Sequence, residues 1–310
     1  MRIFVTGASG WIGSDVVPEL IGAGHQVVGL ARSDESAAAL RAAGADVLPG
    51  TLDDLDILQK AAADTDGVIH LAFKHELAFT GDFAAAAGAD RAAVEAFGDA
   101  LAGTDRPFVL ASGILGLTPG RVATEEDGLV ADPSLDLPAG PETRLATARV
   151  TLGFASRGVR SSVVRLPPTV HGDGDNGFMA AIVGFARASG VSGYLGDGSN
   201  RWPATHRSDV ARIFRLAAEQ APAGSVLHAV AEEGVPLRSV AEVIGRQLGL
   251  PVEAVPAEDA ERQFSFLSNF LGLDSPASSA ATRVLLDWQP TGPGLIEDLE
   301  AGHYTRDPAA

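Results

Sequence analysis

The chain has 310 residues, of which 46% are hydrophobic and 20% charged, so it can bury a sizeable core and extended disorder is not expected. It carries 23 Lys and Arg against 40 Asp and Glu, a net charge of −17, and no run of basic residues, which argues against a nucleic acid partner. There is no Cys, which excludes disulfides, thiolate nucleophiles and thiolate metal ligands.

The first half of the chain alternates between short apolar runs and longer stretches with helical spacing. The runs that predict strands are residues 3–5, 25–30, 45–48, 67–72, 107–111 and 161–165. The stretches that predict helices are residues 12–23, 35–43, 55–63, 83–101 and 142–157. Apolar strands separated by helices are typical of a parallel sheet covered on both faces. With right-handed crossovers, this predicts an α/β fold whose residues 1–170 form a doubly wound Rossmann-type domain.

The pattern changes after residue 170. Glycine-rich loops appear at 172–175 and 196–200, and helical spacing recurs at 209–219, 237–248 and 257–271. We expect residues 171–305 to form a smaller α+β lobe over the carboxyl ends of the strands, where a substrate would bind. Segments of this lobe can also add strands to the main sheet.

The start of the chain is unlike a targeting signal. Residues 1–7 contain an apolar run of three residues, which is too short for a signal peptide. No segment approaches the roughly 18 uninterrupted apolar residues that a membrane span needs. We therefore expect a cytoplasmic protein without a membrane partner.

Three glycines, Gly7, Gly10 and Gly13, follow the first predicted strand and open the first predicted helix. Glycines let the backbone turn sharply, approach a diphosphate closely and pack the helix on the sheet. The N-terminus of that helix then presents free N–H groups and a partial positive charge to the diphosphate. The segment therefore predicts a dinucleotide site; the alternative is a tight turn without a ligand.

Five segments carry patterns that occur together in one family. They are Thr6–Gly13 (TGxxGxxG), His70–Ala72 (HLA), Arg165–Gly172 (R-x-x-x-V-Y-G, with His171 for Tyr), Thr205–Ala211 (hVdDvA) and Leu286–Pro290 (lGWxP). In this order they resemble the short-chain dehydrogenase/reductase superfamily, and specifically its extended, epimerase/dehydratase-like branch. The resemblance covers nearly the whole chain. It implies a dinucleotide cofactor and a small-molecule substrate, without naming that substrate.

The resemblance also implies which residues hold each ligand. The dinucleotide would contact Thr6, Gly7, Ser9, Gly10, Trp11, Ile12, Gly13, Arg32, Ser33, Leu52, Leu71, Ala72, Phe73, Pro167, Thr169 and Val170. The substrate would contact His75, Phe178, Tyr194, Arg201 and Trp202, each of which could equally belong to the core of the lobe or serve a structural role. No HExxH or paired-His spacing occurs, so no metal is expected.

The end of the second predicted strand bears on the choice between NAD(H) and NADP(H). An acid there accepts a hydrogen bond from the ribose 2′-OH, whereas an Arg pairs with a 2′-phosphate. Here the strand is followed by Arg32 and Ser33, with no acid before Asp34, which favours NADP(H) over NAD(H). In the alternative, Arg32 is a solvated surface residue and Asp34 is the ribose partner.

The catalytic residues of the family are not where the resemblance implies them. The family uses a Tyr-x-x-x-Lys pair with a Ser, but neither Tyr194 nor Tyr304 is followed by Lys four residues later. The helix that should carry the pair has Arg144 and Ala148 in the two places. The Ser position aligns with either Ser112 or its neighbour Gly113. The usual proton donor is therefore absent.

Three functions remain open. The first is a reductase or dehydrogenase acting on a small carbonyl, alcohol or imine, with Ser112, Arg144 and His171 as catalytic candidates. His171 or His75 could move a proton near neutral pH, Arg144 could polarise a carbonyl or hold a carboxylate, and water could supply the proton instead. The second is an NmrA-like redox sensor that binds NADP(H) without turnover. The third is an epimerase or dehydratase.

The resemblance finally implies a homodimer. In this branch the helices that follow the fourth and fifth strands often pair across a dimer. Here those helices are residues 83–102 and 142–157, and the Ala-rich composition of the first permits close approach.

Overall fold

The computed structural model describes residues 1–79, 81–130 and 139–306. Its largest element is a seven-stranded sheet in which all neighbouring strands are parallel. From edge to edge the strands are β3 (Asp46–Pro49), β2 (Gln26–Ala31), β1 (Arg2–Thr6), β4 (Gly67–His70), β5 (Pro107–Gly113), β6 (Arg160–Leu166) and β10 (Ser225–His228). The strand order reverses between β1 and β4. In open α/β sheets such a reversal creates the crevice in which ligands bind, at the carboxyl ends of the strands.

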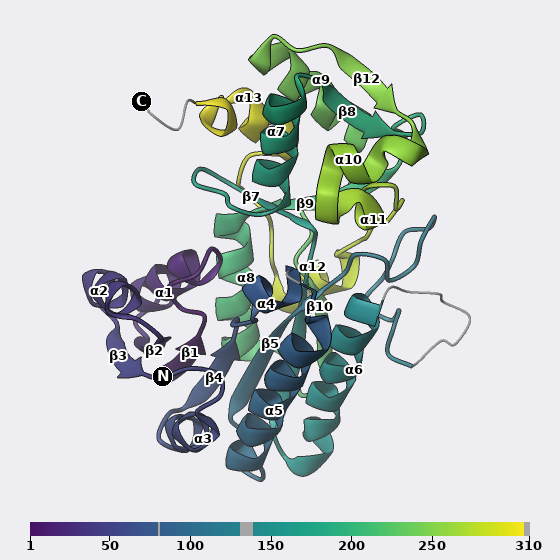
Figure 1. Cartoon of the computed structure of the whole chain (residues 1–310). Helices are drawn as coiled ribbons and strands as arrows, with labels where there is room; N and C mark the ends of the chain where they lie inside the picture. Colours follow the sequence, from purple (N-terminus) through teal and green to yellow (C-terminus); the bar gives the residue numbers. More distant parts are fainter. Residues whose placement is uncertain (80, 131–138, 307–310) are drawn as a thin grey trace.

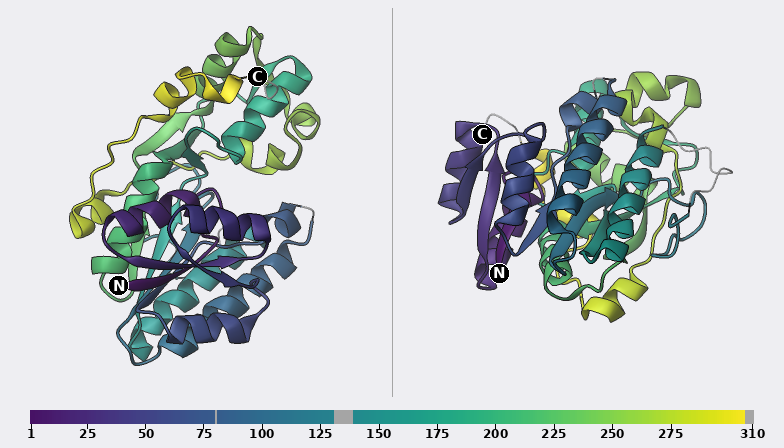
Figure 2. Two further views of the ribbon diagram at one scale, coloured as in Figure 1. Left: turned by 90° about the vertical axis from the view of Figure 1, so that its left-hand side faces the viewer. Right: turned by 90° about the horizontal axis from the view of Figure 1, so that it is seen from below.

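Helices cover both faces of this sheet (Figures 1 and 2). One face carries α1 (Gly13–Gly22), α2 (Asp34–Ala42), α8 (Arg207–Gln220) and α12 (Ala280–Leu286), and the other carries α3 (Leu55–Ala63), α5 (Phe83–Leu101) and α6 (Ala139–Gly153). The short helix α4 (His75–Phe79) packs on α5. The predicted doubly wound α/β fold is confirmed.

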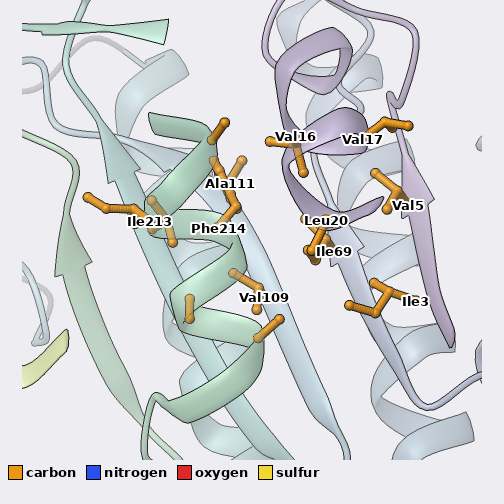
Figure 3. Packing of buried hydrophobic residues seen from close by; sticks show 14 of the residues in the cluster. Ile3, Val5, Val16, Val17, Leu20, Ile69, Val109, Ala111, Ile213 and Phe214 are labelled. Atoms are coloured by element: carbon orange, nitrogen blue, oxygen red, sulfur yellow. The ribbon is translucent and has the colours of Figure 1, made fainter. Parts of the chain in front are cut away.

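Each strand divides its side chains between two cores. In β1, Ile3 and Val5 pack toward α1, whereas Phe4 packs toward α3 and α5, as strand alternation requires. Figure 3 shows the first of these cores, where Val16 and Leu20 of α1 and Phe214 of α8 cover the sheet. All these side chains are buried, and each contributes about 1.5–3 kcal/mol through removal from water.

A smaller lobe stands above the carboxyl ends of the main strands (Figure 1). Its sheets are β11 (Glu232–Pro236), β9 (Arg201–His206) and β7 (Thr169–His171) in one, and β12 (Val252–Val255) with β8 (Ser192–Leu195) in the other. Its helices are α7 (Phe178–Ser189), α9 (Leu237–Leu248), α10 (Ala260–Phe264), α11 (Ser268–Leu271) and α13 (Leu295–Glu300). The chain crosses between the two parts several times, since α8, β10 and α12 return to the main sheet.

The single helix predicted over residues 257–271 is wrong. The segment breaks into a 3-10 turn (Ala257–Asp259), α10, a second 3-10 turn (Ser265–Leu267) and α11. Ser265 has φ +48°, outside the helical region, and this residue ends α10. The polar stretch 259–263 offers too few apolar residues to hold one long helix against the core, and the buried side chains that anchor the segment are mainly Phe264, Leu267 and Leu271.

In the part of the chain that the structure describes, no helix combines the length and apolar character that crossing a bilayer requires. The dimer expected for α5 and α6 stays a prediction; within the chain these two helices lie side by side on the same face of the sheet.

Candidate functional site

The glycine loop joins β1 to α1 at the carboxyl edge of the sheet. Gly7 has φ +66°, and a Cβ there would lie 2.7 Å from the backbone nitrogen of Ala72. A Cβ on Gly13 would overlap the carbonyl oxygen of Gly7. Side chains are therefore excluded at both positions, and Ser9 and Gly10 lie exposed at the tip of the loop. The result is a bare backbone cradle ahead of a helix N-terminus, which suits a diphosphate.

Trp11 fixes the cradle to the smaller lobe. Its indole Nε1 donates to the carbonyl oxygen of Val170 in β7 at 3.0 Å. The Arg207 guanidinium stacks over the indole at 4.0 Å and pairs with Asp15 of α1, with Nη2 2.6 Å from Oδ1. Arg207 also donates to the Asp173 carbonyl oxygen at 3.2 Å. These contacts place Trp11, Ile12 and Val170 at the junction where the two parts of the molecule meet.

Thr6 and His70 brace the loop from below. The Thr6 hydroxyl lies 2.6 Å from His70 Nδ1 and accepts from the Ala72 backbone N–H at 3.3 Å. On the other side of the ring, His70 Nε2 lies 3.2 Å from Asp90 Oδ1 on α5, and both residues are buried. The resemblance implied Thr6 as a cofactor contact, and here its hydroxyl positions the backbone at Leu71 and Ala72.

Arg32 and Ser33 follow β2 at the edge of the same crevice. The Arg32 side chain is 70% exposed, and its Nη2 lies 2.9 Å from Glu76 Oε1 of α4. Ser33 caps α2, and its hydroxyl accepts from the Ser36 N–H at 3.2 Å. Leu52 is buried in the core beside α3. Arg32 is thus available at the surface, whereas the Ser33 hydroxyl already has a partner.

Arg144 reaches from α6 to the carboxyl ends of β4 and β5. Its Nη2 donates to the Ala111 carbonyl oxygen at 2.9 Å, and its guanidinium lies 4.3 Å from the centre of the Phe73 ring. The His75 ring contacts the same phenyl ring with 5.1 Å between centroids. Burial lowers the pKa of Arg144. Burial, and then the Arg144 charge, lower the pKa of His75 to about 4, although the residue as a whole is exposed.

Ser112 lies next to these residues near the end of β5. It is buried, and its hydroxyl has no hydrogen-bond partner among the described residues. Across the sheet Ser112 pairs with Arg165 of β6, which in turn pairs with His228 of β10. Ser112 and Arg144 therefore lie near the same end of β5, because Arg144 donates to the carbonyl oxygen of Ala111, the residue before Ser112.

His171 has a different environment. The residue is 0% exposed, and its Nδ1 lies 2.8 Å from Asp298 Oδ2 of α13. Its ring contacts His206 at 5.5 Å, and His303 approaches the same carboxylate. Among the described residues, the polar and ring contacts of His171 are with the smaller lobe and with His206 just before α8, and none is with Ser112 or Arg144.

The residues implied as substrate contacts separate into two groups. Trp202 is 0% exposed, donates to the Leu273 carbonyl oxygen and stacks with Phe178, so both belong to the core of the smaller lobe. Arg201 pairs with Asp274 through two N–O contacts of 3.0 and 2.8 Å, at the rim of a shallow hollow of 460 Å³. Tyr194 lies beneath the Arg238 guanidinium. Pro167, between β6 and β7, and Thr169, the first residue of β7, are both buried.

Several residues that shape the site are absent from the sequence predictions. Asp90 could have been suspected because it is an acid on the buried side of an Ala-rich helix. Arg207 lies within the segment 205–211, where only the family pattern was recognised. Glu76 and helix α4 gave no signal, since five residues are too few to show a helical period.

The chain is similar to known proteins over nearly its whole length. The model of the NAD dependent epimerase/dehydratase family matches residues 3–87. An uncharacterized protein of Schizosaccharomyces pombe is 47% identical over 98% of this chain and 100% of that protein. A ketoreductase of Stigmatella aurantiaca, named for a 4-hydroxy-2-methyl-3-oxo-4-farnesyl-3,4-dihydroquinoline-1-oxide, is 28% identical over 82% of this chain and 75% of that protein.

Solved structures agree on the fold. That of MoeE5 in complex with UDP-glucose and NAD superposes with a TM-score of 0.76 over 98% of this chain and 97% of the other, at 24% identity. The enzymes named among these similar proteins include a UDP-glucose 4-epimerase, a dTDP-glucose 4,6-dehydratase with NAD bound and a sterol-4-alpha-carboxylate 3-dehydrogenase. The chain as a whole therefore belongs to the same family as the Schizosaccharomyces pombe protein, and its residues 3–87 match the NAD dependent epimerase/dehydratase family.

Proposed function

We propose that the protein is an NADP(H)-dependent oxidoreductase that moves a hydride to or from a small carbonyl, alcohol or imine by an atypical mechanism. The observation that carries this proposal is the side-chain-free cradle of Gly7, Gly10 and Gly13 at the N-terminus of α1. The 28% identity with a ketoreductase over most of the chain supports reduction of a carbonyl as the reaction class.

The cofactor preference rests on Arg32. The residue lies directly after β2, where the position calls for an acid in an NAD(H) site and a base in an NADP(H) site. Its surface ion pair with Glu76 is worth at most about 1 kcal/mol, so a 2′-phosphate can replace it at little cost. Glu76 then remains close enough to orient the guanidinium.

The chemistry proposed for this chain's own residues is electrostatic. When bound, the nicotinamide supplies or accepts the hydride. Arg144 offers a fixed positive charge where the family's Tyr is expected, and it cannot serve as a proton donor because it stays charged. His75 is uncharged at neutral pH because its pKa is about 4, so it is a poor acid there. Water is left as the proton source.

The cofactor proposal predicts the effect of Arg32→Asp. Replacing the cation by an acid removes the partner of the 2′-phosphate and supplies an acceptor for the ribose 2′-OH. We expect NADPH affinity to fall at least tenfold, about 1.4 kcal/mol, and NADH affinity to hold or rise. Arg41→Asp, at the far end of α2, is the matched control. An unchanged NADPH-to-NADH ratio would show that Arg32 does not select the cofactor.

The redox-sensor alternative is favoured by one observation, the presence of Arg144 and Ala148 at the two catalytic positions of the family. A turnover assay separates the two functions. The protein is incubated with NADPH and, in turn, 2-oxo acids, ketones, aldehydes and imines, while the nicotinamide absorbance is followed. Consumption of NADPH with any of them supports the oxidoreductase. Tight NADPH binding, with no NADPH consumed in the presence of any of the four substrate classes, would favour the sensor.

A further inference from the structure

Arg144 is a cation that forms no ion pair with any residue that the structure describes. Among the described residues no carboxylate lies within ion-pair distance of its guanidinium, although the chain carries 40 acids and only 23 Lys and Arg. Other half-buried arginines of the described part do pair with acids, as Arg207 does with Asp15 and Arg215 with Glu19. Removing an unpaired charge from water is costly, and burial already lowers the pKa of Arg144.

The contacts of Arg144 with the described residues hold the guanidinium in place but use few of its N–H donors. One N–H donates to the Ala111 carbonyl oxygen, and one flat face lies over the Phe73 ring. A guanidinium has five N–H donors in a rigid fork, so a planar two-oxygen acceptor can still bind along its remaining edge. Stacking on Phe73 restricts the rotation of the fork, which lowers the entropy lost on binding.

The surrounding charges do not cancel the charge of Arg144. The nearest acid that acts on it is Asp90, whose carboxylate lies 3.2 Å from His70 Nε2 inside the protein. His75 is neutral at physiological pH because its pKa is about 4. Arg144 therefore keeps a positive charge beside the ends of β4 and β5, opposed by the more distant Asp90 carboxylate, in a protein whose overall charge is −17.

From these observations we infer that Arg144 binds a carboxylate of the substrate, so that the substrate class is a small oxo acid or the corresponding hydroxy acid. This inference rests on the proposed function, because it places the anion at the crevice where the carbonyl would be reduced. The carboxylate is unchanged by the reaction: a hydride adds to the carbonyl carbon, and water gives a proton to the resulting alkoxide. Arg144 thus selects the substrate and fixes its orientation.

The test is a calorimetric titration of the NADPH-loaded protein with oxalate, and with neutral oxamide as the matched ligand of the same shape. The wild type should bind oxalate at least tenfold more tightly than oxamide. Arg144→Gln keeps the planar end but removes the charge, and should weaken oxalate binding at least tenfold, about 1.4 kcal/mol. Arg144→Lys should give an intermediate value, because it keeps the charge without the fork. Arg91→Gln, at an exposed ion pair on α5, should match the wild type.

Three results would overturn the inference. Equal oxalate affinity in the wild type and Arg144→Gln would show that another group binds the anion. Absence of oxalate, acetate and succinate binding by the wild type at millimolar concentration would exclude a carboxylate site. A loss of NADPH affinity in Arg144→Gln, with circular dichroism unchanged, would assign Arg144 to the cofactor. If the wild type binds no NADPH at all, the proposed function fails, and oxalate titration of the protein alone still decides the role of Arg144.

Discussion

His70 occupies the end of a buried strand at the edge of the crevice, yet both of its ring nitrogens lie within hydrogen-bond distance of groups inside the protein, Thr6 and Asp90. It therefore holds the backbone around Ala72 rather than facing a ligand. Arg144 differs, because among the described residues its guanidinium donates to one acceptor, the Ala111 carbonyl oxygen. The contrast between these two residues depends on side-chain partners, and no pattern in the sequence reveals it.

The His70–Asp90 contact predicts a stability cost for Asp90→Asn. The substitution replaces a charged carboxylate beside the buried imidazole with a neutral amide, which has a single, weaker acceptor oxygen. We expect the free energy of unfolding to fall by about 1–3 kcal/mol. Asp99→Asn on the same helix, which removes an exposed pair with Arg157, should cost under about 1 kcal/mol. Urea unfolding of the two variants checks this, and equal losses would contradict the structural role given to Asp90.

His228 makes stability depend on pH. Burial, and then the Arg165 charge, lower its pKa from 6.5 to about 4. Between these values the unfolded chain binds a proton that the folded protein excludes, so stability falls as the pH falls through this window. The slope from one such site reaches about 1.4 kcal/mol per pH unit, and His75 acts in the same direction. Urea unfolding across the window should give a flatter slope for His228→Gln; an identical slope would contradict the assignment.

At the scale of elements, most of the main sheet could be predicted from the sequence, and most of the smaller lobe could not. Strands β1, β2 and β4–β6 each contain a short apolar run between helices, and each lies within a few residues of its predicted position. In contrast β7, β8 and β12 have three or four residues, too few to show a period. Strand β10 joins the main sheet only through its pairing with β6, a contact between distant parts of the chain.

The close packing of the glycine loop against α1 predicts that alanine substitutions at two glycines of this helix have opposite effects on stability. Gly13→Ala places a methyl group against the Gly7 carbonyl oxygen, which pushes α1 away from the loop. It should cost about 1–3 kcal/mol of stability and weaken NADPH binding at least tenfold. Gly22→Ala meets nothing within 4 Å and should stabilise by up to about 1 kcal/mol, with binding unchanged. Thermal unfolding and NADPH titration of both variants test this; a neutral Gly13→Ala would mean that the loop is not tightly packed.

At the scale of the whole molecule, the smaller lobe is tied to the dinucleotide-binding part through the glycine loop itself. The Trp11 indole donates a hydrogen bond to the Val170 carbonyl oxygen of β7. Arg207, at the start of α8, stacks on Trp11 and donates a hydrogen bond to the Asp173 carbonyl oxygen. A ligand on the loop therefore lies beside the contacts that join the two parts. The sequence predicted both parts and their order, but not this junction, because its members are more than 150 residues apart.

The most direct test of the central claim is a titration of the wild-type protein with NADPH, and in parallel with NADH, while tryptophan emission is followed. Trp11 lies in the glycine loop, so a bound reduced nicotinamide should quench its emission. We expect saturable quenching by NADPH and weaker binding of NADH. No binding of either dinucleotide would contradict the account, because the glycine cradle would then serve another ligand or none.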